Sequence, residues 1–230
     1  MNGRRLLAEF IGTAMLLAAI VGSGIVVSVE GPAPTQLFQH AVIVGAVLAA
    51  MILTFGSVSG AHFNPSVTIA NAVFGGQSWG LAAGYVTAQI AGAIVGVGAT
   101  NWIFGEPAWA IAAVERSGLL LVASEAMATF GLVVVIFGTV RSSSLSAVAG
   151  AVGSYIAAAI FFTASAAFAN PAVTIARLFT DTWSGISPGG VRSFLVGQVI
   201  GTAVAIAVIG YLFPSTDVEG PAERMRKGET

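Results

Sequence analysis

Apolar residues along this chain fall into long runs separated by short polar, charged or Pro/Gly-rich stretches. A helix needs roughly 20 apolar residues to cross a bilayer core about 30 Å thick. Six runs come close to or exceed that length, at about 6–29, 38–57, 79–104, 118–140, 146–163 and 191–213. The pattern therefore predicts an all-α membrane protein with six transmembrane helices.

Two further apolar segments, 60–71 and 168–177, lie between these runs and are too short to cross the bilayer. Each contains an Asn-Pro pair, Asn64-Pro65 in the first and Asn170-Pro171 in the second. Asn is a favoured N-cap and Pro suits the first helical turn, so each pair is expected to start a helix. Non-helical backbone at membrane depth is tolerated only where protein buries it or water lines it. We therefore expect two re-entrant half-helices beside an aqueous cavity.

The two halves of the chain carry polar residues at matching places. The matches are Glu9 with Glu125, Asn64 with Asn170, and Gln89 with Gln198. Because each half contains three spans, the second half enters the membrane from the opposite face, as in the inverted repeats of transport proteins. We expect one channel domain over residues 1–213, with repeats at about 5–104 and 117–213, followed by a polar tail at 214–230.

Two half-helices that face each other at mid-membrane would form an electrostatic filter. Each helix N-terminus carries about half a positive elementary charge, and each Asn side chain offers N–H donors. Water or an alcohol would be held there by its oxygen, whereas cations and protons would meet a barrier. This pattern predicts a passive channel for small uncharged solutes.

Composition excludes several other classes of protein. Only 8% of the residues are charged, 56% are hydrophobic and the net charge is −1, which does not suit a nucleic-acid partner. The chain has no cysteine and only two histidines, so we expect no metal site and no cofactor. Because no arrangement of nucleophile, base and orienting group appears, we do not expect an enzyme.

Basic residues orient the chain in the membrane. Six of them fall on one side of a six-span topology: Arg4, Arg5, Arg141, Arg224, Arg226 and Lys227. Arg116, Arg177 and Arg192 fall on the other side. Because Lys and Arg are enriched in cytoplasmic segments, both termini are expected to be cytoplasmic in a multi-pass inner (plasma) membrane protein.

Three motifs closely resemble those of the aquaporin family, also called major intrinsic proteins. They are Ala-Glu-Phe-Ile-Gly-Thr at 8–13, Ser-Gly-Ala-His-Phe-Asn-Pro-Ser-Val-Thr at 59–68, and Asn-Pro-Ala-Val-Thr at 170–174. The resemblance implies six tilted helices, two half-helices and one pore in each protomer of a homotetramer. The pore motifs would be Asn64, Pro65, Ser66 and Asn170, Pro171, Ala172. Carbonyls of Gly60, Ala61, His62, Ala166, Ala167 and Phe168 would line the pore.

Glu9 and Glu125 are ionisable residues within spans, which marks them as candidates for function. The family resemblance implies that they brace the re-entrant loops by accepting hydrogen bonds from loop N–H groups. The alternative is proton coupling in a secondary transporter, which shares inverted repeats and broken helices with this pattern. That alternative predicts solute flux that depends on a proton gradient.

The sequence departs from the family at its outer filter. Most members carry Arg after the second Asn-Pro-Ala, where this chain has Val173, and glycerol-conducting members usually continue with Asp, where it has Thr174. The other filter positions fall on Val44, Ala158 and Ala167, so a wide apolar filter is implied. Bacterial members with Val at this place resemble channels associated with arsenic handling. Arsenite-type metalloid hydroxides are therefore the leading cargo, with a glycerol and water facilitator as the alternative.

Arg177 lies four residues after Val173, on nearly the same helix face and about 6 Å further along the axis. Two interpretations are open for this cation. It faces the outer vestibule of the pore, or it pairs with Asp181, which lies four residues further on.

Overall fold

The computed structural model describes residues 2–28, 33–141 and 143–213, so the expected tail at 214–230 lies outside the described residues. Its long helices are α1 (Asn2–Ser28), α2 (Ala33–Ser59), α4 (Trp79–Ile103), α5 (Leu119–Val140), α6 (Leu145–Phe162) and α8 (Pro188–Leu212). All six are long and apolar enough to cross a membrane, and the described residues contain no strand. The prediction of an all-α protein with six spans is confirmed.

Two short helices occupy the places where the sequence predicts re-entrant segments. They are α3 (Pro65–Val73) and α7 (Pro171–Ala176), and the 3-10 turn η1 (Arg177–Phe179) follows α7. Each short helix begins with Pro, and the preceding Asn caps it through its side chain. Both helices therefore start at the Asn-Pro pairs, as local helix chemistry dictates.

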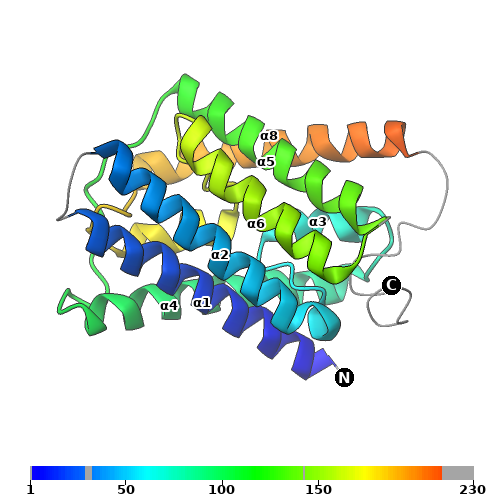
Figure 1. Ribbon diagram of the computed structural model, residues 1–230, viewed down its shortest axis with the longest axis horizontal. Coiled ribbons are helices and arrows are strands. Elements are labelled where there is room, and N and C mark those ends of the chain that lie inside the picture. Colours follow the sequence, from blue (N-terminus) through cyan, green and yellow to red (C-terminus); the bar gives the residue numbers. More distant parts are fainter. Residues whose placement is uncertain (1, 29–32, 142, 214–230) are drawn as a thin grey trace.

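The long helices pack as two related halves. Helix α1 packs against α4 and α2, α5 packs against α8 and α6, and α2 packs against α6 across the two halves. Close helix approach depends on glycine, because a Cβ at Gly92 or Gly96 would fall within about 3 Å of the α1 backbone. Figure 1 shows α1 and α2 side by side, with the start of α1 and the end of α8 at the same end of the molecule.

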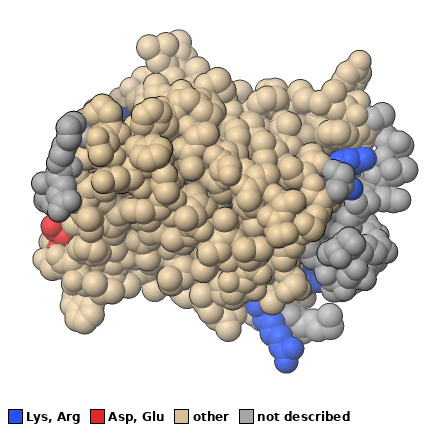
Figure 2. Space-filling model, viewed as in Figure 1, with Lys and Arg blue, Asp and Glu red and all other residues tan. Residues whose placement is uncertain are grey.

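The outer surface is a broad apolar belt. Large hydrophobic side chains are exposed on every long helix, as Met15, Phe38, Trp102, Leu120, Phe161 and Ile200 illustrate. In Figure 2 the middle of the visible face shows no charged side chain, and the most prominent Lys and Arg side chains lie at the end where α1 begins. This distribution suits a chain whose middle lies in lipid and whose ends meet water.

Candidate channel site between the half-helices

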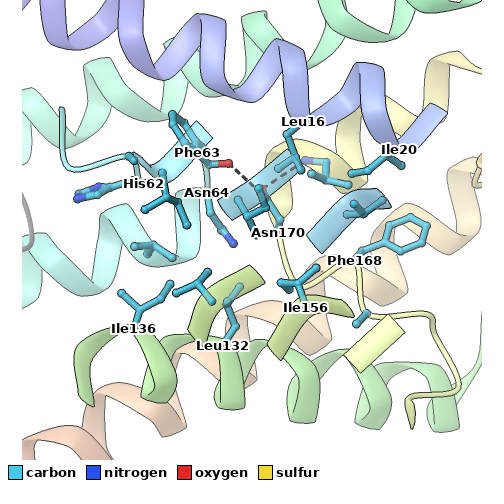
Figure 3. A pocket seen from close by; sticks show the side chains of 18 of the residues that line it. Leu16, Ile20, His62, Phe63, Asn64, Leu132, Ile136, Ile156, Phe168 and Asn170 are labelled. Carbon is cyan, nitrogen blue, oxygen red and sulfur yellow. Dashed lines mark hydrogen bonds between the residues drawn. The ribbon is translucent and has the colours of Figure 1, made fainter. Parts of the chain in front are cut away.

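The two re-entrant half-helices meet through their capping asparagines. Asn64 Nδ2 donates a hydrogen bond of 2.8 Å to the carbonyl oxygen of Ala169, and Asn170 Nδ2 donates one of 2.8 Å to the carbonyl oxygen of Phe63. The bonds are reciprocal, because each joins one repeat to the loop that precedes the other asparagine. Figure 3 shows Asn64 and Asn170 side by side at the centre of a cavity.

Each asparagine side-chain amide makes hydrogen bonds within the protein and also faces the cavity. Asn64 Oδ1 accepts a hydrogen bond from Ser66 N at 2.9 Å, and Asn170 Oδ1 accepts one from Ala172 N at 3.0 Å. An amide NH₂ group carries two protons, of which the bond to the opposite carbonyl uses one. Both asparagines line the cavity, so each has a second N–H to offer to a solute oxygen.

The loops before the two asparagines have a matching and unusual backbone. Three residues of the loop in the second repeat, Ala166, Ala167 and Ala169, have positive φ angles of 56°, 43° and 48°. Their counterparts in the first repeat, Gly60, Ala61 and Phe63, have positive φ angles of 90°, 50° and 49°. Left-handed backbone costs about 1–2 kcal/mol at each non-glycine residue, so other contacts must hold these loops in place.

Glu9 supplies those contacts in the first repeat. Its carboxylate accepts hydrogen bonds from His62 N at 3.0 Å and from Phe63 N at 2.7 Å. It also accepts bonds from the Ser59 hydroxyl at 2.6 Å and from Gln89 Nε2 at 2.7 Å. Glu9 is fully buried, and every one of these donors belongs to the loop or to the helices around it.

Glu125 holds the second loop in the same way. Its carboxylate accepts hydrogen bonds from Phe168 N at 2.9 Å, from Ala169 N at 2.8 Å and from Gln198 Nε2 at 2.7 Å. Gln198 Nε2 also donates to the Thr174 hydroxyl at 2.7 Å, which ties α8 to α7. Of the polar residues that match between the two halves, the glutamate and the glutamine therefore contact each other within each repeat, whereas the asparagines join the repeats.

One cavity runs past both asparagines. Its wall is largely aliphatic and comes from both halves of the chain, with Leu16, Ile20, Leu48, Ile52, Leu132, Ile136, Ile156 and Ile160 among its members. All six residues expected to supply pore carbonyls, at 60–62 and 166–168, line it. Across the described part of the chain, no group of three His, Cys, Asp or Glu residues could hold a metal ion.

Three of the four expected filter residues line this cavity, namely Val44, Ala167 and Val173. The assignment of Ala158 is wrong, because its side chain is exposed on the outer surface of α6. Ile156 and Ile160 of the same helix line the cavity in its place. The reason is geometric: a shift of two residues turns a side chain by about 200° around a helix.

Arg177 is 4% exposed and lines the cavity together with Phe168. Its Nε donates to the carbonyl oxygen of Ser184, and its guanidinium lies 3.5 Å from the centroid of the Phe168 ring. Asp181 accepts a hydrogen bond from Ala113 N at 2.9 Å. Arg177 and Asp181, both of which the structure describes, form no ion pair with each other. The structure thus turns Arg177 toward the cavity and away from Asp181.

His40 is a site residue that was not predicted from the sequence. This histidine is 3% exposed, lies on α2 four residues before Val44 and lines the cavity. A single histidine within an apolar run is more often a buried structural residue, so its type alone gave no reason to select it. Its spacing from Val44 would have been the usable signal, because residues four apart share a helix face.

Comparison with known proteins gives consistent matches over most of the chain. A family model described as "Major intrinsic protein" matches residues 1–146. The aquaglyceroporin AqpS of Rhizobium meliloti is 40% identical over 210 residues, which cover 91% of this chain and 90% of that protein. A probable NIP-type aquaporin of Nicotiana alata is 32% identical over 227 residues, which cover 93% of this chain and 79% of the relative.

Solved structures show where the same fold occurs. The aquaglyceroporin from Plasmodium falciparum superposes with a TM-score of 0.76 at 20% identity, covering 93% of this chain and 98% of that one. A channel of the FNT family superposes with a TM-score of 0.55 at 14% identity, covering 91% of each chain. At such identities the likeness concerns the fold alone.

Proposed function

Because the chain belongs to the major intrinsic protein family, we propose that it is a passive transmembrane channel for water and small uncharged solutes. The observation that carries this proposal is the pair of capped half-helices whose asparagines meet at the cavity. The partial positive charges of the two helix ends add up there, and the spare N–H groups bind an oxygen. A neutral solute can pass by exchanging hydrogen bonds, whereas a cation finds no carboxylate among the residues that line the cavity.

The small apolar residues that line the cavity next to the asparagines favour solutes larger than water. Val44, Ala167 and Val173 replace bulky or charged filter groups with small apolar ones, so size discrimination is weak. Arsenite-type hydroxides are the leading specialised cargo, since As(OH)₃ is small, uncharged at neutral pH and rich in hydroxyl groups. Glycerol is the alternative cargo, and the similarity to the Rhizobium meliloti aquaglyceroporin supports it.

The glutamates support a channel over an ion-coupled transporter. Both carboxylates are fully buried and bonded to backbone N–H groups of the loops, and neither residue lines the cavity. A coupling carboxylate must exchange protons with the transport path. Glu9 and Glu125 are instead placed to hold the strained loops, and we assign them that bracing role.

The family and the distribution of charge support a proposal for the assembly and its placement. We assign the chain to the inner (plasma) membrane as a homotetramer with one pore in each protomer. Arg4 and Arg5 follow Asn2 at the start of α1, and the Arg141 guanidinium lies 4.7 Å from the centroid of the Phe213 ring, just past the end of α8 at the same end of the molecule (Figure 1). Cytoplasmic ends of membrane proteins are rich in such cations. This distribution supports our assignment of both termini to the cytoplasm.

The cargo can be tested in proteoliposomes. Stopped-flow light scattering would compare water, glycerol, urea and arsenite in vesicles with and without the protein. We expect permeabilities above the protein-free background for water, glycerol and arsenite. Vesicles that pass water but exclude arsenite, glycerol and urea would contradict the proposed wide filter and leave a water channel.

A further inference from the structure

Two polar side chains lie one helical turn outside the apolar filter. His40 precedes Val44 by four residues on α2, and Arg177 follows Val173 by four residues at the end of α7. Helix α2 starts at the end of the molecule opposite to the start of α1 (Figure 1), so His40 lies on the outer side of Val44. Helix α7 starts at its capping residue Asn170, so Arg177 lies further from the asparagines than Val173. Both residues are therefore displaced in the same direction, toward the outer mouth, by about 6 Å along the helix axes.

A single loop supports both side chains. The Trp183 ring contacts the His40 ring edge-on, with 5.1 Å between the centroids, and the neighbouring Ser184 accepts the hydrogen bond from Arg177. Arg116 fastens this loop by donating to the carbonyl oxygens of Trp183 at 3.0 Å and of Gly185 at 3.1 Å. His40 and Arg177 thus contact adjacent residues of one loop, to which Arg116 is hydrogen-bonded.

The contacts of Ser23 with the carbonyl oxygens of its own helix favour one tautomer of His40. The Ser23 hydroxyl donates its one proton to the carbonyl oxygen of Ala19 at 2.5 Å, so it can only accept at its 2.7 Å contact with His40 Nδ1. We therefore assign the proton to Nδ1, and this tautomer leaves Nε2 as a hydrogen-bond acceptor. None of the hydrogen bonds within the described ranges involves Nε2.

Arg177 supplies the complementary donors. Only its Nε is engaged, by Ser184, while one face of the guanidinium rests on the Phe168 ring. Within the described part of the chain, its two terminal nitrogens have no hydrogen-bond partner, although the residue is 4% exposed and lines the cavity. A buried cation with unused N–H groups is costly unless a solute or water binds them.

We propose that Arg177 and His40 form an outer site that binds one hydroxyl group of an uncharged solute, such as a polyol or an undissociated oxyacid. The hydroxyl oxygen accepts from a terminal N–H of Arg177, and the hydroxyl proton is donated to Nε2 of His40. This inference rests on the proposed channel function and names the solute chemistry that the outer mouth selects. Arg116 acts as a positioning residue, because it holds the loop and does not touch the solute.

The location explains why such a site is useful. A solute must give up water before it passes Val44, Ala167 and Val173, which offer no side-chain hydrogen bond. The outer pair replaces part of that hydration immediately before the apolar ring. Cations are repelled by Arg177, and a solute that only accepts hydrogen bonds can use Arg177 but not His40.

The test compares two neutral solutes in proteoliposomes that contain variant channels. Glycerol both donates and accepts hydrogen bonds, whereas dimethyl sulfoxide only accepts them. His40→Phe keeps a ring against Trp183 and removes the acceptor, and Arg177→Met removes the donors. Arg192→Met is the matched control, because it removes an exposed outer cation on α8.

We expect His40→Phe to lower glycerol permeability about two- to tenfold, the effect of one net hydrogen bond, without lowering that of dimethyl sulfoxide. Arg177→Met should lower the permeability to both solutes, and Arg192→Met should lower neither permeability.

Retained water permeability will show that the pore is folded. If Arg177→Met does not fold, the result for His40→Phe alone decides. Unchanged glycerol permeability in His40→Phe, or equal loss of both solutes, would overturn the site. A wild-type channel no faster than protein-free vesicles would instead overturn the proposed function.

Discussion

Asn170 Nδ2 donates a 2.8 Å hydrogen bond to the carbonyl oxygen of Phe63, a residue of the other repeat. The bond from Asn64 to Ala169 repeats this contact in the opposite sense, so the two half-helices hold each other at the centre of the cavity. Each asparagine therefore has three roles. It caps its helix through Oδ1, joins the two repeats through one side-chain N–H, and directs a second N–H to solutes in the cavity.

Replacing Asn170 with Asp should keep the helix-capping role and remove the two donor roles. The carboxylate keeps the helix cap, but it loses the donor to Phe63 O and adds a negative charge to the cavity wall. We expect K⁺ flux to rise in proteoliposomes and the free energy of unfolding to fall by about 1–3 kcal/mol. Asn101→Asp makes the same change at a buried residue away from the cavity and should leave K⁺ flux unchanged. K⁺ flux equal to wild type in Asn170→Asp would contradict the role given to the asparagine donor.

Replacing Glu125 with Gln tests the bracing role. The two backbone donors and Gln198 Nε2 all require an acceptor, whereas a Gln amide has only one oxygen. We expect a lower thermal midpoint, with destabilisation of about 1–3 kcal/mol, and remaining glycerol flux that is the same with or without a proton gradient. Glu115→Gln, at a surface carboxylate, is the control. Proton-driven flux in wild type that disappears in a folded Glu125→Gln channel would favour the coupled transporter.

Replacing Val173 with Arg should narrow the filter and add a fixed cation. We expect permeability to glycerol and arsenite to fall at least about tenfold while water permeability stays within about threefold of wild type. Val173→Leu enlarges the same side chain without charge and should give a smaller loss. The filter assignment fails if Val173→Arg conducts glycerol as fast as wild type.

The two alanines of the expected filter should behave differently. Ala167 lines the cavity, so Ala167→Leu should lower glycerol permeability several-fold by filling the passage. Ala158 is exposed on the outer face of α6, so Ala158→Leu should leave permeability unchanged. Stopped-flow measurements on the pair check this assignment, and a blocked Ala158→Leu channel would restore the sequence-based filter.

Local chemistry made much of this fold predictable. The Asn-Pro pairs set the starts of α3 and α7, because capping and the missing N–H of proline act within a few residues. The match of Glu9 with Glu125, and of Gln89 with Gln198, was visible in the two halves of the sequence, whereas the bond between the Glu and the Gln of each repeat appears only in the structure. A polar residue in a long apolar span needs a partner, and the matching residue supplies a candidate.

The rotation of α6 was not predictable in the same way. This helix is apolar on every face, so no periodicity marks the side that meets the cavity. Counting back from Asn170 to Ala158 crosses the irregular loop after Phe162, whose backbone includes residues of positive φ. A helical register does not carry through such a loop, and the count selected the outer face in place of Ile156 and Ile160. His40 was not selected because a single histidine in an apolar run is more often a buried structural residue, although its spacing of four residues from Val44 marked the same helix face.

The most direct test of the channel is passive glycerol entry into proteoliposomes with no ion or proton gradient, measured by stopped-flow light scattering alongside K⁺ flux in the same preparation. The structure predicts re-swelling faster than in protein-free vesicles, slowed by Val173→Arg, with K⁺ flux at background. Glycerol entry no faster than in protein-free vesicles, or entry that requires an ion gradient, would contradict a passive channel for neutral solutes.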